Sequence, residues 1–285
     1  MTFLETCKRI VVEGSHAEIQ FLNPSSFVDS GGEDLHTRSS LVVETSRKFV
    51  ELQTYQVTAR VPLIEQLEIP GLVGIDSKEN LLGILYRERQ AQQEKALMKI
   101  YVEEGEKESS KSWNLLQRIL NRFGYVPKFC HKNLSEQILK KMVENSEQIS
   151  SKTHTGPANF AVISHKEFYI LSSHPEFVKT ERDSMSMAQI YSGGKIRNFT
   201  VFVDPRSQGR LIVGSTTKEN EPGVYFIENA ASPEKTELTS SEGPVLALRS
   251  RQCIVNLGEE NRKYTCIHLS EKRYNFFSYI WQKIK

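Results

Sequence analysis

Cysteine and histidine side chains that could do chemistry lie close together near the end of the sequence. Cys266 and His268 are two residues apart, which places a thiol and an imidazole on the same face of a strand; Cys253 precedes them. A thiol nucleophile or a metal site needs such neighbours. Because no fourth ligand stands at a recognisable spacing, we interpret them as buried sheet residues, with a thiol-dependent hydrolase as the alternative. Cys130 and His131 are adjacent, so they point to opposite faces if extended, and we interpret them as structural.

Two glycine motifs suggest phosphate chemistry only weakly. Ser192-Gly193-Gly194-Lys195 resembles part of a phosphate loop, but a P-loop needs a longer spacing and a helix after it, whereas a strand is expected here. We therefore predict a turn before a strand, and a flexible segment at Gly31-Gly32. The sequence thus predicts no catalytic residue, no cofactor and no metal, and hence a protein that is not an enzyme.

Arginines form two basic pairs, Arg249 with Arg251 and Arg206 with Arg210. They could contact nucleic acid or a neighbour's carboxylates, or they could be solvated surface residues. In the whole chain, 37 Lys and Arg oppose 35 Asp and Glu, a formal charge of +2. That balance argues against a dedicated nucleic-acid binder, although a wall that only encloses nucleic acid remains compatible with it.

The composition is that of an ordinary globular protein. The 285 residues allow one or two domains, and 38% hydrophobic and 25% charged residues fit a soluble chain. Four cysteines without paired spacing indicate reduced thiols in a cytosolic setting. The N-terminus has no apolar signal region and no run approaches about 18 apolar residues, so neither secretion nor a membrane span is expected.

The first quarter of the chain predicts elements that bury little by themselves. Residues 1–40 form a weakly patterned arm, and Ser25–Ser40 has little to bury. Leu41–Val61 is rich in strand formers. Its apolar residues change from even to odd positions, which would move them to the other face of a strand, so a bulge or turn is expected near Gln53-Thr54. A thin hairpin built from this run and the preceding one would need a partner chain.

A long helix is predicted next. Lys78–Glu103 contains no proline and would span roughly 40 Å, with Asp76 and Glu79 as a capping box. Apolar patches occupy its two ends, while Arg87–Lys95 is nearly all polar. We therefore expect the helix to lie across a thin domain with its centre partly exposed, followed by a charged linker at Glu103–Lys111.

The rest of the chain alternates helices and short strands. Three runs between Asn198 and Glu228 predict an antiparallel set of three strands, and a loop is expected between Glu228 and Val245. The dense aromatic residues after position 264 could close the core or anchor a subunit contact. The other predicted elements are helices at Trp113–Phe123, Leu134–Ile149 and His165–Ser173, and strands at Asn159–Ser164, Val245–Val255 and Lys263–Leu269.

The order of several short motifs resembles the major capsid proteins of tailed phages, especially the T-even group. These motifs are the strand end Val203-Asp204-Pro205, the strand Leu211–Gly214 and the strand Pro222–Phe226. Gly74-Ile75-Asp76 before the long helix and the buried strand at Asn159 are similar too, so the resemblance spans Tyr55–Ile267. It implies an α+β protein of the tailed-phage capsid fold.

This resemblance also implies a division of the chain and a set of intersubunit contacts. The expected parts are an N-terminal arm (1–40), an extended β-loop (41–75), a peripheral domain with a spine helix (76–111), an axial domain (112–240) and a C-terminal return to the peripheral domain (241–285). The expected contact residues are Val50, Leu52, Tyr55, Val57, Arg60, Arg182 and Arg206.

The function that the resemblance implies is structural. Copies of the chain would assemble into hexamers and pentamers of an icosahedral or prolate head shell, part of the virion, built in the cytoplasm of a bacterial host. Expected partners are the chain itself, portal, vertex, scaffold and decoration proteins, and packaged double-stranded DNA through non-specific contacts, with no membrane. An encapsulin-type shell around a cargo enzyme is the alternative with a similar fold.

Overall fold

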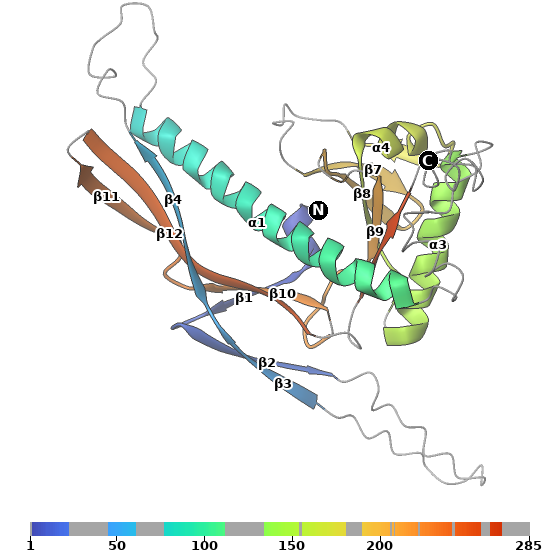
Figure 1. Ribbon diagram of the computed structural model, residues 1–285, viewed down its shortest axis with the longest axis horizontal. Helices are drawn as coiled ribbons and strands as arrows, with labels where there is room; N and C mark the ends of the chain where they lie inside the picture. Colours follow the sequence, from blue (N-terminus) through green and yellow to red (C-terminus); the bar gives the residue numbers. More distant parts are fainter. Residues whose placement is uncertain are drawn as a thin grey trace, which may run out of the picture.

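The computed structural model describes residues 2–22, 45–60, 77–111, 134–153, 156–180, 190–205, 207, 209–221, 223–240, 243–257 and 263–269. Within these residues the chain mixes a few helices with many short strands (Figure 1), so the predicted α+β class is confirmed. The helices are α1 (Ser77–Lys111), α3 (Leu134–Thr153) and α4 (His165–Leu171), and a 3-10 turn occupies Phe3–Thr6.

One sheet has six strands in the order β13-β9-β5-β8-β7-β6. Its strand β5 (Phe160–Ile163) runs parallel to β8 (Phe199–Val203) and antiparallel to β9 (Arg210–Gly214). The predicted antiparallel set between Asn198 and Glu228 was therefore wrong: the fully apolar β5 inserts between β8 and β9, and the third run joins the other sheet. The remaining strands are β13 (Tyr264–His268), β7 (Tyr191–Ile196) and β6 (Phe177–Lys179).

The second sheet is built on β12 (Gly243–Asn256), a strand of 14 residues. One side of β12 pairs with β4 (Gln53–Arg60), and the other pairs with β11 (Glu234–Ser240) and β10 (Val224–Asn229). The loop predicted between Glu228 and Val245 was wrong, because this polar run forms β11 on an edge that β12 provides. Strand β1 (Lys8–Val12) completes the sheet by pairing in parallel with β10.

Helix α1 is shared by the two sheets (Figure 1). Its 35 residues span about 52 Å, at about 1.5 Å per residue. Leu85 packs with Leu248 of the second sheet, whereas Leu97 and Tyr101, about three to four turns before the helix end, pack with the six-stranded sheet. The charged linker predicted at Glu103–Lys111 was wrong: these residues continue the helix, which suits their Glu and Lys content.

The six-stranded sheet is covered on both faces. Phe160 and Val162 pack in the cluster that contains α1 residues, while Ala161 and Ile163 pack in the cluster that contains α3 residues. This alternation explains why all of β5 is buried and apolar. Helices α3 and α4 lie close to their predicted positions, which confirms both.

Strands β2 (His16–Leu22) and β3 (Thr45–Glu51) form the predicted antiparallel hairpin. Leu52 separates β3 from β4, so the predicted irregularity lies one residue earlier than Gln53-Thr54. One face of the hairpin packs on the second sheet, where it forms a core cluster with Tyr225, Ile227, Val255 and Leu257. The hairpin face that does so carries Ala17, Ile19, Phe21 and Val50.

Several predictions lie outside the described residues. They are the segment Ser25–Ser40, the cap at Asp76, the helix at Trp113–Phe123, the pair Cys130-His131, and the aromatic residues that follow position 269.

Candidate assembly surfaces and a buried polar seam

The residues predicted to contact a neighbouring subunit have different environments within this chain. Leu52 is 6% exposed and Val57 is 7% exposed, so both side chains are covered by the subunit's own core. Val50 is half-buried beside Leu52, whereas Tyr55 is 39% exposed. The side chain of Arg60, and the residues Arg182 and Arg206, lie outside the described part of the chain.

Phe49 is the most exposed of the large apolar side chains on the hairpin, at 76%. It points away from the core because its parity in β3 is opposite to that of Val50. Across the hairpin it pairs with Glu18, which forms an ion pair of 3.3 Å with Arg47. A phenylalanine ring left in water among charged residues is a natural contact for a second chain. Phe49 was not among the predicted contact residues, although the parity of β3 was a usable signal for its exposure.

Two further exposed apolar side chains lie on α4 and β6. Tyr169 is 74% exposed and Val178 is 68% exposed. Beneath them, Phe168 and Phe177 pack edge to face with ring centroids 5.8 Å apart. These aromatic rings hold α4 against β6, so the exposed pair belongs to a firmly packed part of the subunit.

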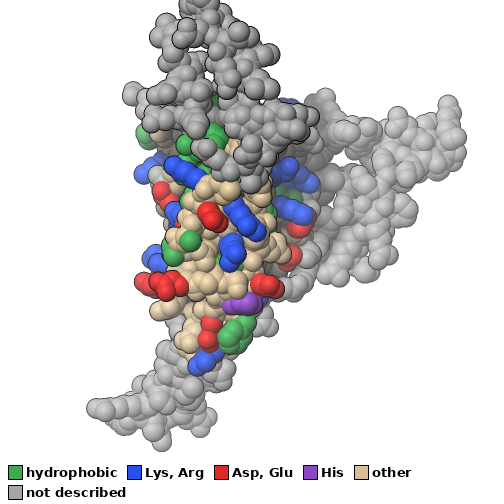
Figure 2. Space-filling model, turned by 90° about the vertical axis from the view of Figure 1, so that its left-hand side faces the viewer, with side chains coloured by type: hydrophobic (Ala, Val, Ile, Leu, Met, Phe, Trp, Pro, Cys, Tyr) green, Lys and Arg blue, Asp and Glu red, His purple; other side chains and the backbone are tan. Residues whose placement is uncertain are grey.

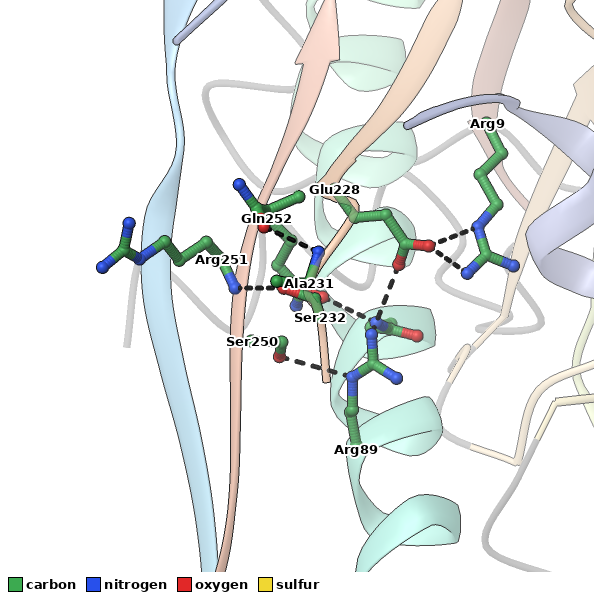
Figure 3. Close-up of polar contacts among 10 residues, drawn as sticks. Arg9, Arg89, Glu228, Ala231, Ser232, Ser250, Arg251 and Gln252 are labelled. Atoms are coloured by element: carbon green, nitrogen blue, oxygen red, sulfur yellow. Dashed lines mark hydrogen bonds and ion pairs between the residues drawn. The ribbon is translucent and has the colours of Figure 1, made fainter. Parts of the chain in front are cut away.

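The face of β12 that points away from α1 is polar in the middle of the strand. Ser250 and Gln252 point toward α1, so Arg249 and Arg251, which alternate with them, point away from it and are exposed. Figure 3 shows Arg251 directed away from the helix, and Figure 2 shows scattered lysine and arginine side chains on this side of the molecule. The second predicted pair is only partly described: Arg210 is half-buried beside a pocket of about 250 Å³.

Polar side chains are buried where α1 crosses the second sheet. The carboxylate of Glu228, 5% exposed, accepts a hydrogen bond of 2.9 Å from Nε of Arg9 and a second, shorter one from a terminal nitrogen of Arg9. Its other oxygen accepts a hydrogen bond of 3.3 Å from Arg89 (Figure 3). The Arg89 side chain is 12% exposed, while that of Arg9 is 63% exposed. We call this group, with the residues in the next paragraph, the polar seam.

The polar seam continues along α1 by one turn. Nε of Arg89 also donates to the hydroxyl of Ser250 at 3.3 Å, and Nε2 of Gln93 donates to Gln252 at 2.6 Å. Glu94, 2% exposed, accepts a hydrogen bond of 3.3 Å from the backbone N–H of Ile190. The prediction of a partly exposed helix centre is confirmed, since Glu88, Gln92 and Lys95 are exposed. The other face of the centre is buried, and the sheet supplies polar partners for its side chains.

Burial and charge act against each other at Arg89. Removal from water lowers the pKa of Arg89, and the Glu228 carboxylate raises it again, whereas the nearby charge of Arg9 lowers it. Two guanidinium groups thus share one buried carboxylate. The seam is held together by that carboxylate, and the two arginines repel each other.

The cysteines do not form a chemical site within the described residues. Burial raises the pKa of the Cys7 thiol to about 12 and also raises the pKa of Cys253, the opposite of what an activated thiolate requires. Cys253 and Cys266 pack in different core clusters. No group of three or more metal-ligating side chains occurs in the described parts of the chain.

The glycine motif at Ser192–Lys195 lies inside strand β7, with a bulge between Ser192 and Gly194. The expected turn before a strand was wrong, because Ser192, Gly194 and Lys195 pair with β8. The next element along the described chain is strand β8 and not a helix, so the motif lacks the geometry of a phosphate loop.

This arrangement, a long helix across two sheets with a projecting hairpin, is the fold of tailed-phage capsid proteins. A virus-like particle protein from Pyrococcus furiosus has a TM-score of 0.53 and 10% identity, covering 94% of this chain and 92% of that one. The mature capsid of bacteriophage PhiM1 has a TM-score of 0.52 and 9% identity, and the match covers 95% of this chain and 87% of that one. An encapsulin from Synechococcus elongatus PCC 7942 has a TM-score of 0.50 and 9% identity, and the match covers 94% of this chain and 88% of that one.

Comparisons by sequence add nothing to this likeness. No protein-family model matches the chain, and no curated protein matches it. Among the helices that the structure describes, none combines the length and apolar character needed to span a membrane.

Proposed function

We propose that this chain is a shell-forming structural protein that assembles with copies of itself. The observation that carries the proposal is the extent of the structural likeness, which covers more than 90% of this chain and of the Pyrococcus furiosus particle protein. The apolar side chains exposed on the hairpin and on α4 and β6 support it, since a shell subunit needs contacts on several sides.

In its finer form, the proposal is a major capsid protein of a tailed phage, similar to the T-even group. Hexamers and pentamers would form an icosahedral or prolate head around double-stranded DNA, assembled in the cytoplasm of a bacterial host and retained in the virion. Portal, vertex, scaffold and decoration proteins would be its other partners. Many modest contacts, made cooperative by ring closure, would supply the stability of the shell.

An encapsulin-type compartment is the second candidate, favoured by the likeness to the Synechococcus elongatus encapsulin. The two candidates differ in what the shell encloses. Particles purified from cells would contain nuclease-protected DNA in the first case and a protein cargo in the second. Gel electrophoresis of the contents, with and without nuclease, separates them.

The experiment that tests assembly is expression of the full chain, followed by size-exclusion chromatography and negative-stain microscopy. We expect closed particles or rings. Phe49→Ser should reduce assembly without lowering the thermal stability of the subunit, because Phe49 is 76% exposed. The matched control is Glu51→Ser, an exposed residue two positions along the same strand. A chain that stays monomeric at high concentration contradicts the proposal.

A further inference from the structure

Strand β4 forms an edge of the second sheet. On one side it pairs with β12, from Gln53 opposite Gln252 to Arg60 opposite Val245 (Figure 1). On its other side, no strand and no backbone hydrogen bond reaches it from the described parts of the subunit. Successive residues of a strand direct their backbone N–H and C=O groups to opposite sides. About half of the eight residues of β4 therefore offer these groups to a further strand.

This edge lacks the features that usually prevent one strand from pairing with another chain. Edge strands are usually short, or they carry charged residues, a proline or a bulge. From Gln53 to Ala59 the sequence has no Asp, Glu, Lys or Arg and no proline. The register with β12 advances one residue at a time, without a bulge. Because Thr54, Gln56 and Thr58 are also exposed, the edge is long, uncharged and accessible.

The other edge strands that the structure describes are protected. Strands β1, β2, β3, β6 and β11 carry charged side chains, namely Lys8 and Arg9, Glu18, Arg47 and Lys48, Lys179, and Glu234 and Lys235. Strand β13 has only five residues and packs against α1, where the ring of Tyr101 lies edge to face on Tyr264. Among the described edges, β4 is thus the exception.

We propose that β4 pairs antiparallel with β4 of a second copy of this chain, so that two sheets become one. The proposal rests on the proposed self-assembly and names one of its contacts. A row of unpaired N–H and C=O groups fits another extended backbone, and a two-fold axis perpendicular to the sheet matches the row with itself. Because β4 is uncharged up to Ala59, the pairing brings no like charges together there. Overlap of about seven residues would add about six backbone hydrogen bonds.

The two-fold axis makes a prediction that disulfide cross-linking can test. Thr54→Cys, Gln56→Cys and Thr58→Cys, on one face of the strand, are assembled alone and mixed in pairs, then oxidised and run on non-reducing gels. In an antiparallel pair the numbers of opposite residues have a constant sum, and opposite Cβ atoms are about 5 Å apart. With the axis at Gln56, position 56 cross-links to itself and position 54 to position 58. Position 54 would lie about 14 Å from its own copy and would not cross-link.

A charge at the edge should prevent the pairing. Gln56→Lys brings two ammonium groups together near the axis, and we expect it to weaken association by at least about tenfold in sedimentation velocity. Gln92→Lys is the matched control, because it makes the same exchange at an exposed position of α1. Thermal unfolding of both variants should match the wild type. Hydrogen exchange should show about half of the β4 amides exchanging fast in the unassembled chain, and all of them protected after assembly.

The outcomes separate this contact from the shell itself. Cross-links confined to one constant sum, together with weaker association of Gln56→Lys, establish the β4 pair. Cross-links no stronger than in the wild type, or equal in all combinations, overturn it, as do β4 amides that stay open in assembled particles or close only when another protein is added. Particles that form equally well from Gln56→Lys refute the β4 contact alone. Dimers that cross-link through β4 but never form particles refute the shell alone.

Discussion

Glu228 is the residue whose replacement tests the polar seam most directly. Glu228→Gln keeps the shape of the side chain but removes the charge that Arg9 and Arg89 share. Arg9 is 63% exposed, so water can replace its lost partner, whereas Arg89 is 12% exposed and cannot be fully hydrated. The cost therefore arises chiefly at Arg89.

Breaking a buried ion pair by removing one partner costs about 3 to 5 kcal/mol. Arg89 keeps its hydrogen bond to Ser250, and glutamine can still accept one hydrogen bond, so we expect the free energy of unfolding to fall by about 2 to 3 kcal/mol. Arg89→Gln alone leaves Glu228 with the exposed Arg9 and should cost somewhat less. The double variant should be more stable than the sum of the two effects predicts, by about 1 to 2 kcal/mol, because it leaves no buried charge without its partner.

The assay is urea unfolding followed by circular dichroism, at a protein concentration where the subunits are unassembled. Glu176→Gln is the matched control, since Glu176 pairs with Arg197 on the surface and its loss should change stability little. If Glu228→Gln lowered the free energy of unfolding by less than about 0.5 kcal/mol, or the two substitutions were additive, Glu228 would not be the group that holds the seam together.

The other predictions concern packing and titration. A Cβ atom on Gly105 would lie 2.8 Å from both the Cβ and the backbone nitrogen of Cys266, so Gly105→Ala should destabilise the subunit by about 1 to 3 kcal/mol. A Cβ atom on Gly83 would have no other atom within 4 Å, so Gly83→Ala should stabilise the subunit by up to about 1 kcal/mol. Thermal unfolding measures both effects. The folded-state pKa of Cys7, about 12, exceeds its ordinary value of 9.0. The buried neutral thiol therefore contributes fully to the free energy of unfolding below pH 9, and this contribution is lost between pH 9 and about 12. Between pH 8 and pH 11, the free energy of unfolding should fall by less in Cys7→Ala than in the wild type, as urea unfolding at each pH would measure. Leu52→Ala should cost about 2 to 4 kcal/mol, because Leu52 fills the subunit's own core; a loss of assembly with unchanged stability would instead place it at an interface.

Local patterns were enough to predict several elements of this fold. The strand β5 and the helices α3 and α4 lie where their apolar spacing placed them, because each is decided by residues a few positions apart. The pairing of β5 between β8 and β9 was not predictable in this way. It depends on which strand best fills the centre of a sheet covered on both faces, and the sequence pattern of β8 does not contain that information.

The residues predicted to contact a neighbouring subunit also show that a local pattern does not decide how a strand is oriented in the fold. Val57 has the residue type of an interface position, but β4 turns it toward α1, where it packs with Leu85 and Leu248. Phe49 has the same apolar character and the opposite orientation. Whether an apolar residue of β3 or β4 faces outward depends on where the chain breaks between these strands, at Leu52. The parity switch in the sequence located that break only approximately.

The polar centre of α1 is the clearest case of a signal that local reasoning misreads. Apolar periodicity treats Arg89 and Gln93 as solvent-facing, yet their partners Glu228, Ser250 and Gln252 lie more than a hundred residues later in the chain. A helix with an apolar stripe throughout could slide along the sheet by one turn at little cost, whereas directional hydrogen bonds at its centre penalise any such shift. We therefore infer that the seam fixes the register of α1 between two apolar clusters, Leu85 at one end and Leu97 at the other. That register sets how the two sheets are held on one helix.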